Sequence, residues 1–132
     1  MDSKKILIVE DEKDIRDLYH EVLSDSGFGV AVAVDGETGL KEATSGDFDL
    51  VLLDIMLPKM DGLQILREIK KDPKLENLKV ILLTNLSTDN VIKEGFAIGA
   101  DSYVIKSEIT PDQLIEEVNK ALAPKAKTPT VS

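Results

Sequence analysis

The stretch Leu50-Val51-Leu52-Leu53-Asp54 decides the fold that this sequence predicts. It is continuously apolar and then ends in an acid, whereas a strand with one face in water alternates between apolar and polar residues. Runs of this kind are typical of strands that are buried on both faces. Residues 6–9 (I-L-I-V) and 80–83 (V-I-L-L) have the same character, so we expect three such strands.

Two further apolar runs, at residues 30–34 after Gly29 and at residues 103–105, complete a set of five predicted strands. After each strand comes a segment in which apolar residues recur at the spacing of an amphipathic helix. The first of these segments ends at Gly27 and is expected to bury Ile15, Leu18, Tyr19, Val22 and Leu23. The fourth is expected to begin at Ser87 and to turn Val91, Ile92 and Phe96 inward.

Helix start signals support the other segments. Asp35 opens the second, Asp61 with Gln64 forms an Asp-x-x-Gln start for the third, and Thr110 with Gln113 forms a capping box at the fifth. Alternation of strands and helices in this way predicts an α/β fold, in which right-handed crossovers place helices on both faces of a parallel sheet.

The composition fits one soluble domain, because 132 residues are about one domain's worth. The chain has no Cys and one His, which excludes disulfides, Cys-ligated zinc and a multi-His metal site. A net charge of −9 disfavours direct nucleic-acid binding, and no apolar run predicts a membrane span or a secretory signal. We expect a cytoplasmic protein with a domain at residues 1–123 and a disordered tail or truncated linker at residues 124–132.

Chemistry is expected at the carboxyl ends of the predicted strands, where open α/β sheets bind ligands. The residues that follow the first, third, fourth and fifth strands are Glu10 and Asp11, Asp54, Thr84, and Lys106. Each has a plainer interpretation: a helix cap for Asp11, a turn residue for Asp54, a backbone partner for Thr84 and a solvated surface lysine for Lys106. The functional interpretation is preferred because all of them are expected to meet at one edge of the sheet.

Carboxylates that meet in this way repel one another unless a positive partner neutralises them. A hard divalent cation fits, so we expect Mg²⁺ (or Mn²⁺) on Asp11 and Asp54, with Glu10 bound directly or through water. A carboxylate beside such an ion can attack a phosphoryl group, which makes Asp54 a candidate phosphoacceptor. Thr84 would then supply a hydroxyl donor, and Lys106 a point charge, to the phosphoryl oxygens.

Together these motifs resemble the receiver domains of two-component response regulators. The resemblance covers about residues 4–123 and rests on I-L-I-V-E-D at the first strand, D-x-x-x-P-x-x-x-G from Asp54 to Gly62, L-L-T ending at Thr84, and G-A-D-x-Y-x-x-K ending at Lys106. It implies a flavodoxin-like, doubly wound (βα)5 fold with strand order 2-1-3-4-5.

The resemblance also implies roles and partners. Asp54 corresponds to the phosphoacceptor, Glu10 and Asp11 to the acidic pair that serves the metal, Thr84 to the switch hydroxyl, Tyr103 to the switch aromatic, and Lys106 to the phosphoryl-contacting lysine. The phosphodonor would be a histidine kinase or a histidine phosphotransfer protein. Phosphorylation would reshape the face formed by the fourth helix, fifth strand and fifth helix, which would control a downstream partner or effector or a homodimer.

Several positions depart from the family pattern or modulate it. Asn85 stands where a smaller residue is common, Ser107 replaces a proline that often follows a cis bond, and Glu10 replaces the more frequent Asp. The isomer of the Lys106–Ser107 bond is therefore open. The positions that flank water access in the family carry Met56 and Leu86, both bulky and apolar, so we expect slow loss of the phosphoryl group, with Asn85 beside the same path.

Two other functions stay open. Phosphatases with an aspartate nucleophile need a second Asp two residues later, where this chain has Met56. A pseudo-receiver would keep the fold and lose the capacity to take a phosphoryl group. Against this alternative stands the presence of Asp11, Asp54, Thr84 and Lys106. A small phosphodonor with Mg²⁺ separates the three: a stable stoichiometric adduct indicates a receiver, turnover a phosphatase, and no reaction a pseudo-receiver. We expect the adduct, and so no turnover enzyme.

Overall fold

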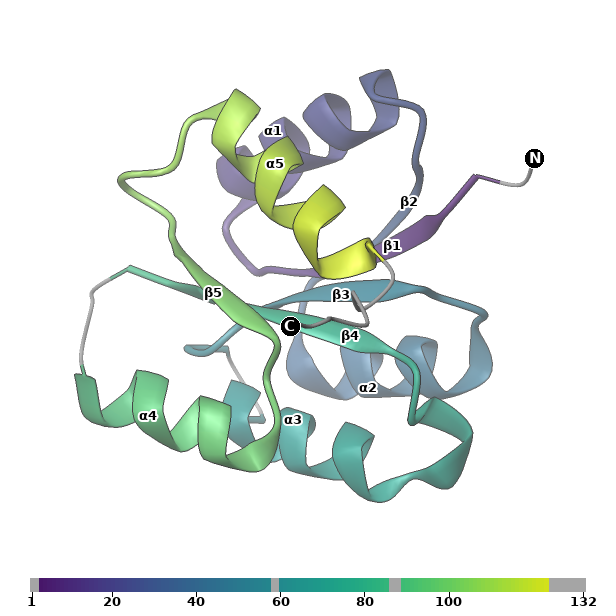
Figure 1. Cartoon of the computed structure of the whole chain (residues 1–132), viewed down its shortest axis with the longest axis vertical. Helices are drawn as coiled ribbons and strands as arrows, with labels where there is room; N and C mark the ends of the chain where they lie inside the picture. The colour runs from purple at the N-terminus through teal and green to yellow at the C-terminus, as the bar shows by residue number, and fades with distance from the viewer. Residues whose placement is uncertain (1–2, 58–59, 86–88, 124–132) are drawn as a thin grey trace, which may run out of the picture.

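The computed structural model describes residues 3–57, 60–85 and 89–123. In these residues five parallel strands form one sheet in the order β2-β1-β3-β4-β5, and five α-helices cover it (Figure 1). This confirms the predicted α/β, doubly wound fold. In chain order the elements are β1 (Lys5–Val9), α1 (Lys13–Asp25), β2 (Gly29–Ala33), α2 (Gly36–Ser45), β3 (Leu50–Asp54), α3 (Gly62–Lys71), a 3-10 turn η1 (Pro73–Leu75), β4 (Lys79–Thr84), α4 (Asp89–Ile98), β5 (Ser102–Ile105) and α5 (Pro111–Leu122).

The sheet separates two apolar cores. Figure 1 shows α1 and α5 on one face of the sheet and α2, α3 and α4 on the other. Alternate residues of the central strands enter alternate cores: Leu7 and Val9 pack toward α2 and α3, whereas Ile6 and Ile8 pack toward α1 and α5. Because both faces of β1, β3 and β4 are covered, their residues are apolar without alternation.

The predicted helix starts are confirmed by their caps. The Asp35 carboxylate accepts a hydrogen bond from the Thr38 amide at α2, and the Asp61 carboxylate accepts one from the Leu63 amide at α3. Thr110 and Gln113 form the capping box of α5 in both directions. These caps fix where each helix begins and therefore how long the preceding loop is at the carboxyl edge of the sheet.

Two residues that the sequence predicts to be buried lie at the surface. Leu18 is 46% exposed and Phe96 is 45% exposed. Helix α1 packs against β1, β2 and α5, and the stripe that these elements cover does not reach Leu18. On α4 the buried Gly95 faces the sheet so closely that a Cβ atom there would clash with Leu82 Cδ1, and the next residue, Phe96, therefore points about 100° away.

Some predicted boundaries also shift. Strand β2 ends at Ala33, so Val34 lies beyond it and is exposed. Helix α4 is described from Asp89, and the predicted start at Ser87 lies outside the described residues. The predicted tail, residues 124–132, also lies outside them.

A buried hydroxyl in the α1 core gives a prediction on stability. The Tyr19 side chain is buried, and its hydroxyl has no hydrogen-bond partner among the described residues. Burial, with a smaller contribution from the charge of Glu10, raises the pKa of Tyr19 to about 12. Because Phe fills the same space without an unsatisfied polar atom, Tyr19→Phe is expected to raise the free energy of unfolding by about 1 kcal/mol.

Urea unfolding followed by circular dichroism measures this difference. Tyr103→Phe is the matched control, because Tyr103 is only partly buried. A Tyr19→Phe protein that is less stable than the wild type would show that the hydroxyl contributes a favourable interaction.

Candidate functional site

Four strand ends deliver polar side chains to one edge of the sheet. Glu10, Asp54, Thr84 and Lys106 are the buried polar or charged residues among those described, and they follow or end β1, β3, β4 and β5. Backbone bonds hold these ends in register: the Ile55 amide donates to the Leu83 carbonyl at 3.0 Å and the Lys106 amide to the Thr84 carbonyl at 2.7 Å. The structure therefore brings together the side chains that the sequence placed at this edge.

The Lys106 ammonium is the centre of this group. Lys106 Nζ donates to Glu10 Oε1 at 3.0 Å and to Glu10 Oε2 at 3.2 Å. It also donates to Asp54 Oδ2 at 3.0 Å and to Glu12 Oε1 at 3.0 Å. One buried lysine thus joins carboxylates from β3 and from the loop after β1, so it is not the solvated surface lysine of the plainer interpretation.

Burial and charge shift the ionisation of these groups. Burial raises the pKa of Glu10 to about 7, although hydrogen bonds from the Glu12 amide and from Lys106 favour its charged form. For Lys106, burial disfavours the charge, but hydrogen bonds to Glu10, Glu12 and Asp54 outweigh burial and hold its pKa above the ordinary range. The ammonium is therefore charged and neutralises part of the acidic group.

The acidic group also has the geometry of a cation site. One carboxylate oxygen from each of Glu10, Asp11 and Asp54 lies within 4.8 Å of the others. Asp11 is exposed, whereas Glu10 and Asp54 are buried. Oxygen ligands of this kind fit a hard divalent cation such as Mg²⁺, which keeps several water ligands and so suits a site with one open side.

Two residues of the site were not predicted. Glu12 contacts Lys106, and Arg16 Nη1 donates to the backbone carbonyls of Glu10 at 3.0 Å and of Asp11 at 3.3 Å. Arg16 therefore anchors the loop that carries the acidic pair. The sequence offers a signal for Glu12, because it is the third acid in the run Glu10-Asp11-Glu12. It offers none for Arg16, whose position in the sequence does not indicate a contact with this loop.

Asp54 is held from both sides. Its Oδ2 accepts from Lys106, and its Oδ1 accepts from the Met56 amide at 3.0 Å. Gly62 lies directly behind it: the Gly62 amide donates to the Ile55 carbonyl at 2.9 Å, and a Cβ atom at this position would clash with the Asp54 carbonyl oxygen. Glycine is needed at this position because α3 approaches the end of β3 too closely to leave room for a side chain.

The residues predicted to govern switching and access lie around this centre. Tyr103 is partly buried and packs edge-to-face on Phe96, with ring centroids 6.1 Å apart. Met56 is 74% exposed and Asn85 is exposed, whereas Leu86 lies outside the described residues. The described residues contain no cis peptide bond, so the Lys106–Ser107 bond is trans.

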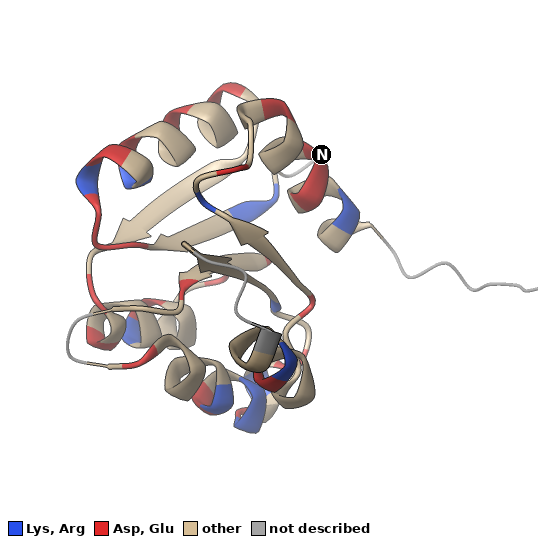
Figure 2. Cartoon of the chain, turned by 90° about the vertical axis from the view of Figure 1, so that its left-hand side faces the viewer, with Lys and Arg blue, Asp and Glu red and all other residues tan. Residues whose placement is uncertain are grey.

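The charge distribution agrees with a site at this edge. Figure 2 shows acidic residues along the helices and in connections just beyond the arrowheads of the strands. Within the described part of the chain, every helix is too short or too polar to cross a membrane.

The chain is similar to known proteins in both sequence and fold. The family model for the response regulator receiver domain matches residues 6–119. The transcriptional regulatory protein DltR of Streptococcus agalactiae is 40% identical over 114 residues, which are 86% of this chain and 50% of that protein. The chain thus spans about half the length of the curated relatives it matches.

Solved structures agree with the sequence comparison. The response regulator TrrA from Thermotoga maritima, solved in complex with Mg²⁺ and BeF, is 42% identical, with a TM-score of 0.80 over 90% of this chain and 99% of that one. A putative response regulator from Chloroflexus aurantiacus has a TM-score of 0.87 at 27% identity, over 93% of this chain and 100% of that one. The family match, the relatives and the fold agree, and the chain belongs to the response regulator receiver domain family.

Proposed function

We propose that this domain takes one phosphoryl group on Asp54 in a Mg²⁺-dependent way. The observation that carries the proposal is the position of the Asp54 carboxylate: it bonds to the buried Lys106 ammonium and lies within 4.8 Å of the Glu10 and Asp11 carboxylates. A carboxylate so placed lies beside both a cation-binding group and an ammonium, which suits the stabilisation of a phosphoryl group.

In the proposed step, an Asp54 carboxylate oxygen forms a bond to phosphorus as the bond from phosphorus to the donor breaks. The electron pair of the broken bond stays with the donor atom, a nitrogen in the case of a phosphohistidine. Glu10, Asp11 and Asp54 would hold Mg²⁺, which when bound offsets negative charge on the carboxylate and the phosphoryl oxygens. Lys106 and Thr84 donate hydrogen bonds to the phosphoryl oxygens.

The phosphoryl acceptor is a side chain of the domain itself. We therefore propose that this is a signalling domain and not an enzyme that turns over a separate substrate. TrrA, whose structure contains Mg²⁺ and BeF, and DltR, a transcriptional regulatory protein, support both the cofactor and the signalling role. A histidine kinase or histidine phosphotransfer protein would be the donor, and output would pass through an unidentified protein or further domain. The predictions of a cytoplasmic location, of no direct nucleic-acid or membrane contact and of a phosphorylation-linked homodimer are untested.

The experiment that tests the proposal is incubation with a small phosphodonor, with and without Mg²⁺, followed by intact-mass measurement. We expect one phosphate per chain with Mg²⁺ and none after chelation. Continuous release of inorganic phosphate in excess of the protein would indicate the phosphatase alternative, and an unchanged mass would indicate a pseudo-receiver. Slow decay of the adduct, expected from Met56 and Leu86 with Asn85 nearby, can be timed in the same samples.

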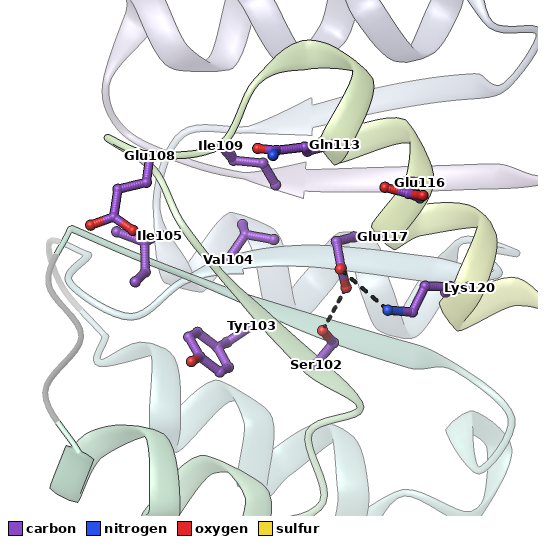
Figure 3. A pocket seen from close by; sticks show the side chains of 10 residues that line it. All are labelled: Ser102, Tyr103, Val104, Ile105, Glu108, Ile109, Gln113, Glu116, Glu117 and Lys120. Carbon is purple, nitrogen blue, oxygen red and sulfur yellow. Dashed lines mark hydrogen bonds and ion pairs between the residues drawn. The ribbon is translucent and has the colours of Figure 1, made fainter.

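The output face is proposed to be α4, β5 and α5. Figure 3 shows a groove between β5 and α5, whose lining includes Tyr103, Ile109 and Glu117. Tyr103 forms the end of this groove nearest α4, where it contacts Phe96. A change at Thr84, which pairs with Ile105 of β5, can therefore reach Tyr103 through the neighbouring strand.

Thr84→Ala is expected to uncouple phosphorylation from Tyr103. With the hydroxyl absent, nothing draws residue 84 toward the phosphoryl group, so Tyr103 gains no space to turn inward. The measurement is the change in Tyr103 ring resonances on addition of Mg²⁺ and beryllofluoride, with Thr44→Ala on the outer part of α2 as control. Equal changes in Thr84→Ala and in the wild type would contradict this route.

A further inference from the structure

Glu12 has a contact that its position does not require. It is the N-cap residue of α1, yet its side chain makes no capping hydrogen bond. Its Oε1 instead accepts from Lys106 Nζ at 3.0 Å, across 94 residues of sequence. The Glu12 side chain is 51% exposed, whereas the side chains of Glu10 and Asp54, the other partners of Lys106, are 0% and 3% exposed.

These contacts occupy all the N–H donors of the Lys106 ammonium. An ammonium has three N–H donors. In this structure they are shared among the carboxylates of Glu10, Glu12 and Asp54. For Lys106 to donate to a phosphoryl oxygen and also keep its hydrogen bond to Asp54, Glu10 or Glu12 must give up its hydrogen bond to the ammonium.

The cost of that release differs between the two. Release of Glu10 would take the ammonium away from a fully buried carboxylate, which would then depend on bound Mg²⁺ alone to compensate its charge. Glu10 is also fixed by the Glu12 amide, which donates to its Oε2 at 3.0 Å. Release of Glu12 returns a half-exposed carboxylate to water, where hydration compensates the lost ion pair.

We propose that Glu12 is a latch that holds Lys106 in the unphosphorylated state and releases it when Asp54 receives its phosphoryl group. This proposal rests on the proposed function of Asp54. Glu12 is a positioning residue: it acts through Lys106 and sets how readily the lysine reaches a phosphoryl oxygen. The latch opposes phosphorylation, because the ion pair between Glu12 and Lys106 must be exchanged each time.

Glu12→Gln tests the latch, because the amide keeps the size of the side chain and removes its charge. At saturating Mg²⁺, titrated separately for each protein, the variant is expected to bind beryllofluoride, a tetrahedral phosphoryl analogue, about fivefold more tightly than the wild type. The initial rate of phosphorylation by a small donor at low concentration is expected to rise by a similar factor.

Asp14→Asn is the matched control. It removes the same charge from the first turn of α1, and Asp14 is not among the Lys106 partners in the described part of the chain. Equal beryllofluoride affinities for the two variants would show that any gain comes from the loss of general repulsion between the acidic side chains and the anion. That result would overturn the latch. An affinity for Glu12→Gln no tighter than that of the wild type would also overturn it.

A spectroscopic readout separates release from a static structural role. The side-chain carboxyl ¹³C resonance of Glu12 is expected to shift when Mg²⁺ and beryllofluoride are added together, while that of Asp14 stays in place. An unchanged Glu12 resonance in a wild-type protein that binds beryllofluoride would overturn the latch alone. A wild-type protein that takes no phosphate would overturn both the latch and the function proposed for Asp54.

Discussion

Asp54→Asn is expected to abolish the gain of one phosphate from a small phosphodonor in the presence of Mg²⁺. The amide is a poor nucleophile and cannot form the acyl phosphate, so loss should be complete within the sensitivity of intact-mass measurement. The fold should persist, because the Asn carbonyl can still accept from the Met56 amide and because removal of one charge relieves repulsion with Glu10.

Asp47→Asn provides the matched control for this change. Asp47 is exposed in the connection before β3, and its replacement should leave the mass gain intact. Circular dichroism of both variants establishes that they are folded. Persistence of the phosphate in Asp54→Asn would move the acceptor to another residue, and peptide mapping of the product would then identify it.

Asp11→Asn is expected to weaken Mg²⁺ binding by about 100-fold, since even the loss of a group that only orients a ligand costs 10- to 100-fold in metal affinity. Asp11 is the exposed member of the acidic group. Glu10 is already engaged by Lys106 and by the Glu12 amide, so Glu10→Gln is expected to weaken binding less. Calorimetric titration with Mg²⁺ compares the two variants directly.

Asp14→Asn again serves as the control for general charge, because Asp14 lies in the first turn of α1 outside the acidic group. We expect it to bind Mg²⁺ with nearly the affinity of the wild type. If Asp11→Asn bound Mg²⁺ as tightly as this control, Asp11 would not be a ligand of the ion.

Local patterns predicted most of the framework because they report local physics. Residues 50–53 are apolar without alternation because helices cover both faces of β3, and the structure places these four residues alternately in the two cores. The capping box at Thr110 satisfies the free amides of Thr110 and Gln113 at the start of α5, where a helix has amides without partners in its own backbone. Such signals depend only on nearby residues.

The meeting of Glu10, Asp54, Thr84 and Lys106 was predictable for a related reason. Parallel strands joined by crossovers end at the same edge, so residues directly after them converge whatever the detailed packing. The resemblance to receiver domains assigned these residues their expected roles.

The sequence by itself therefore determined the order of strands and helices, the edge that carries the polar residues and the candidate acceptor. Tertiary structure alone decided which partners those residues take and which helix faces are covered. Lys106 binds Glu12 as a third carboxylate partner because the long Lys106 side chain reaches from the end of β5 to the loop after β1. Leu18 and Phe96 are left exposed because a helix buries only the stripe that its neighbours cover, and that stripe depends on how helices pack side by side.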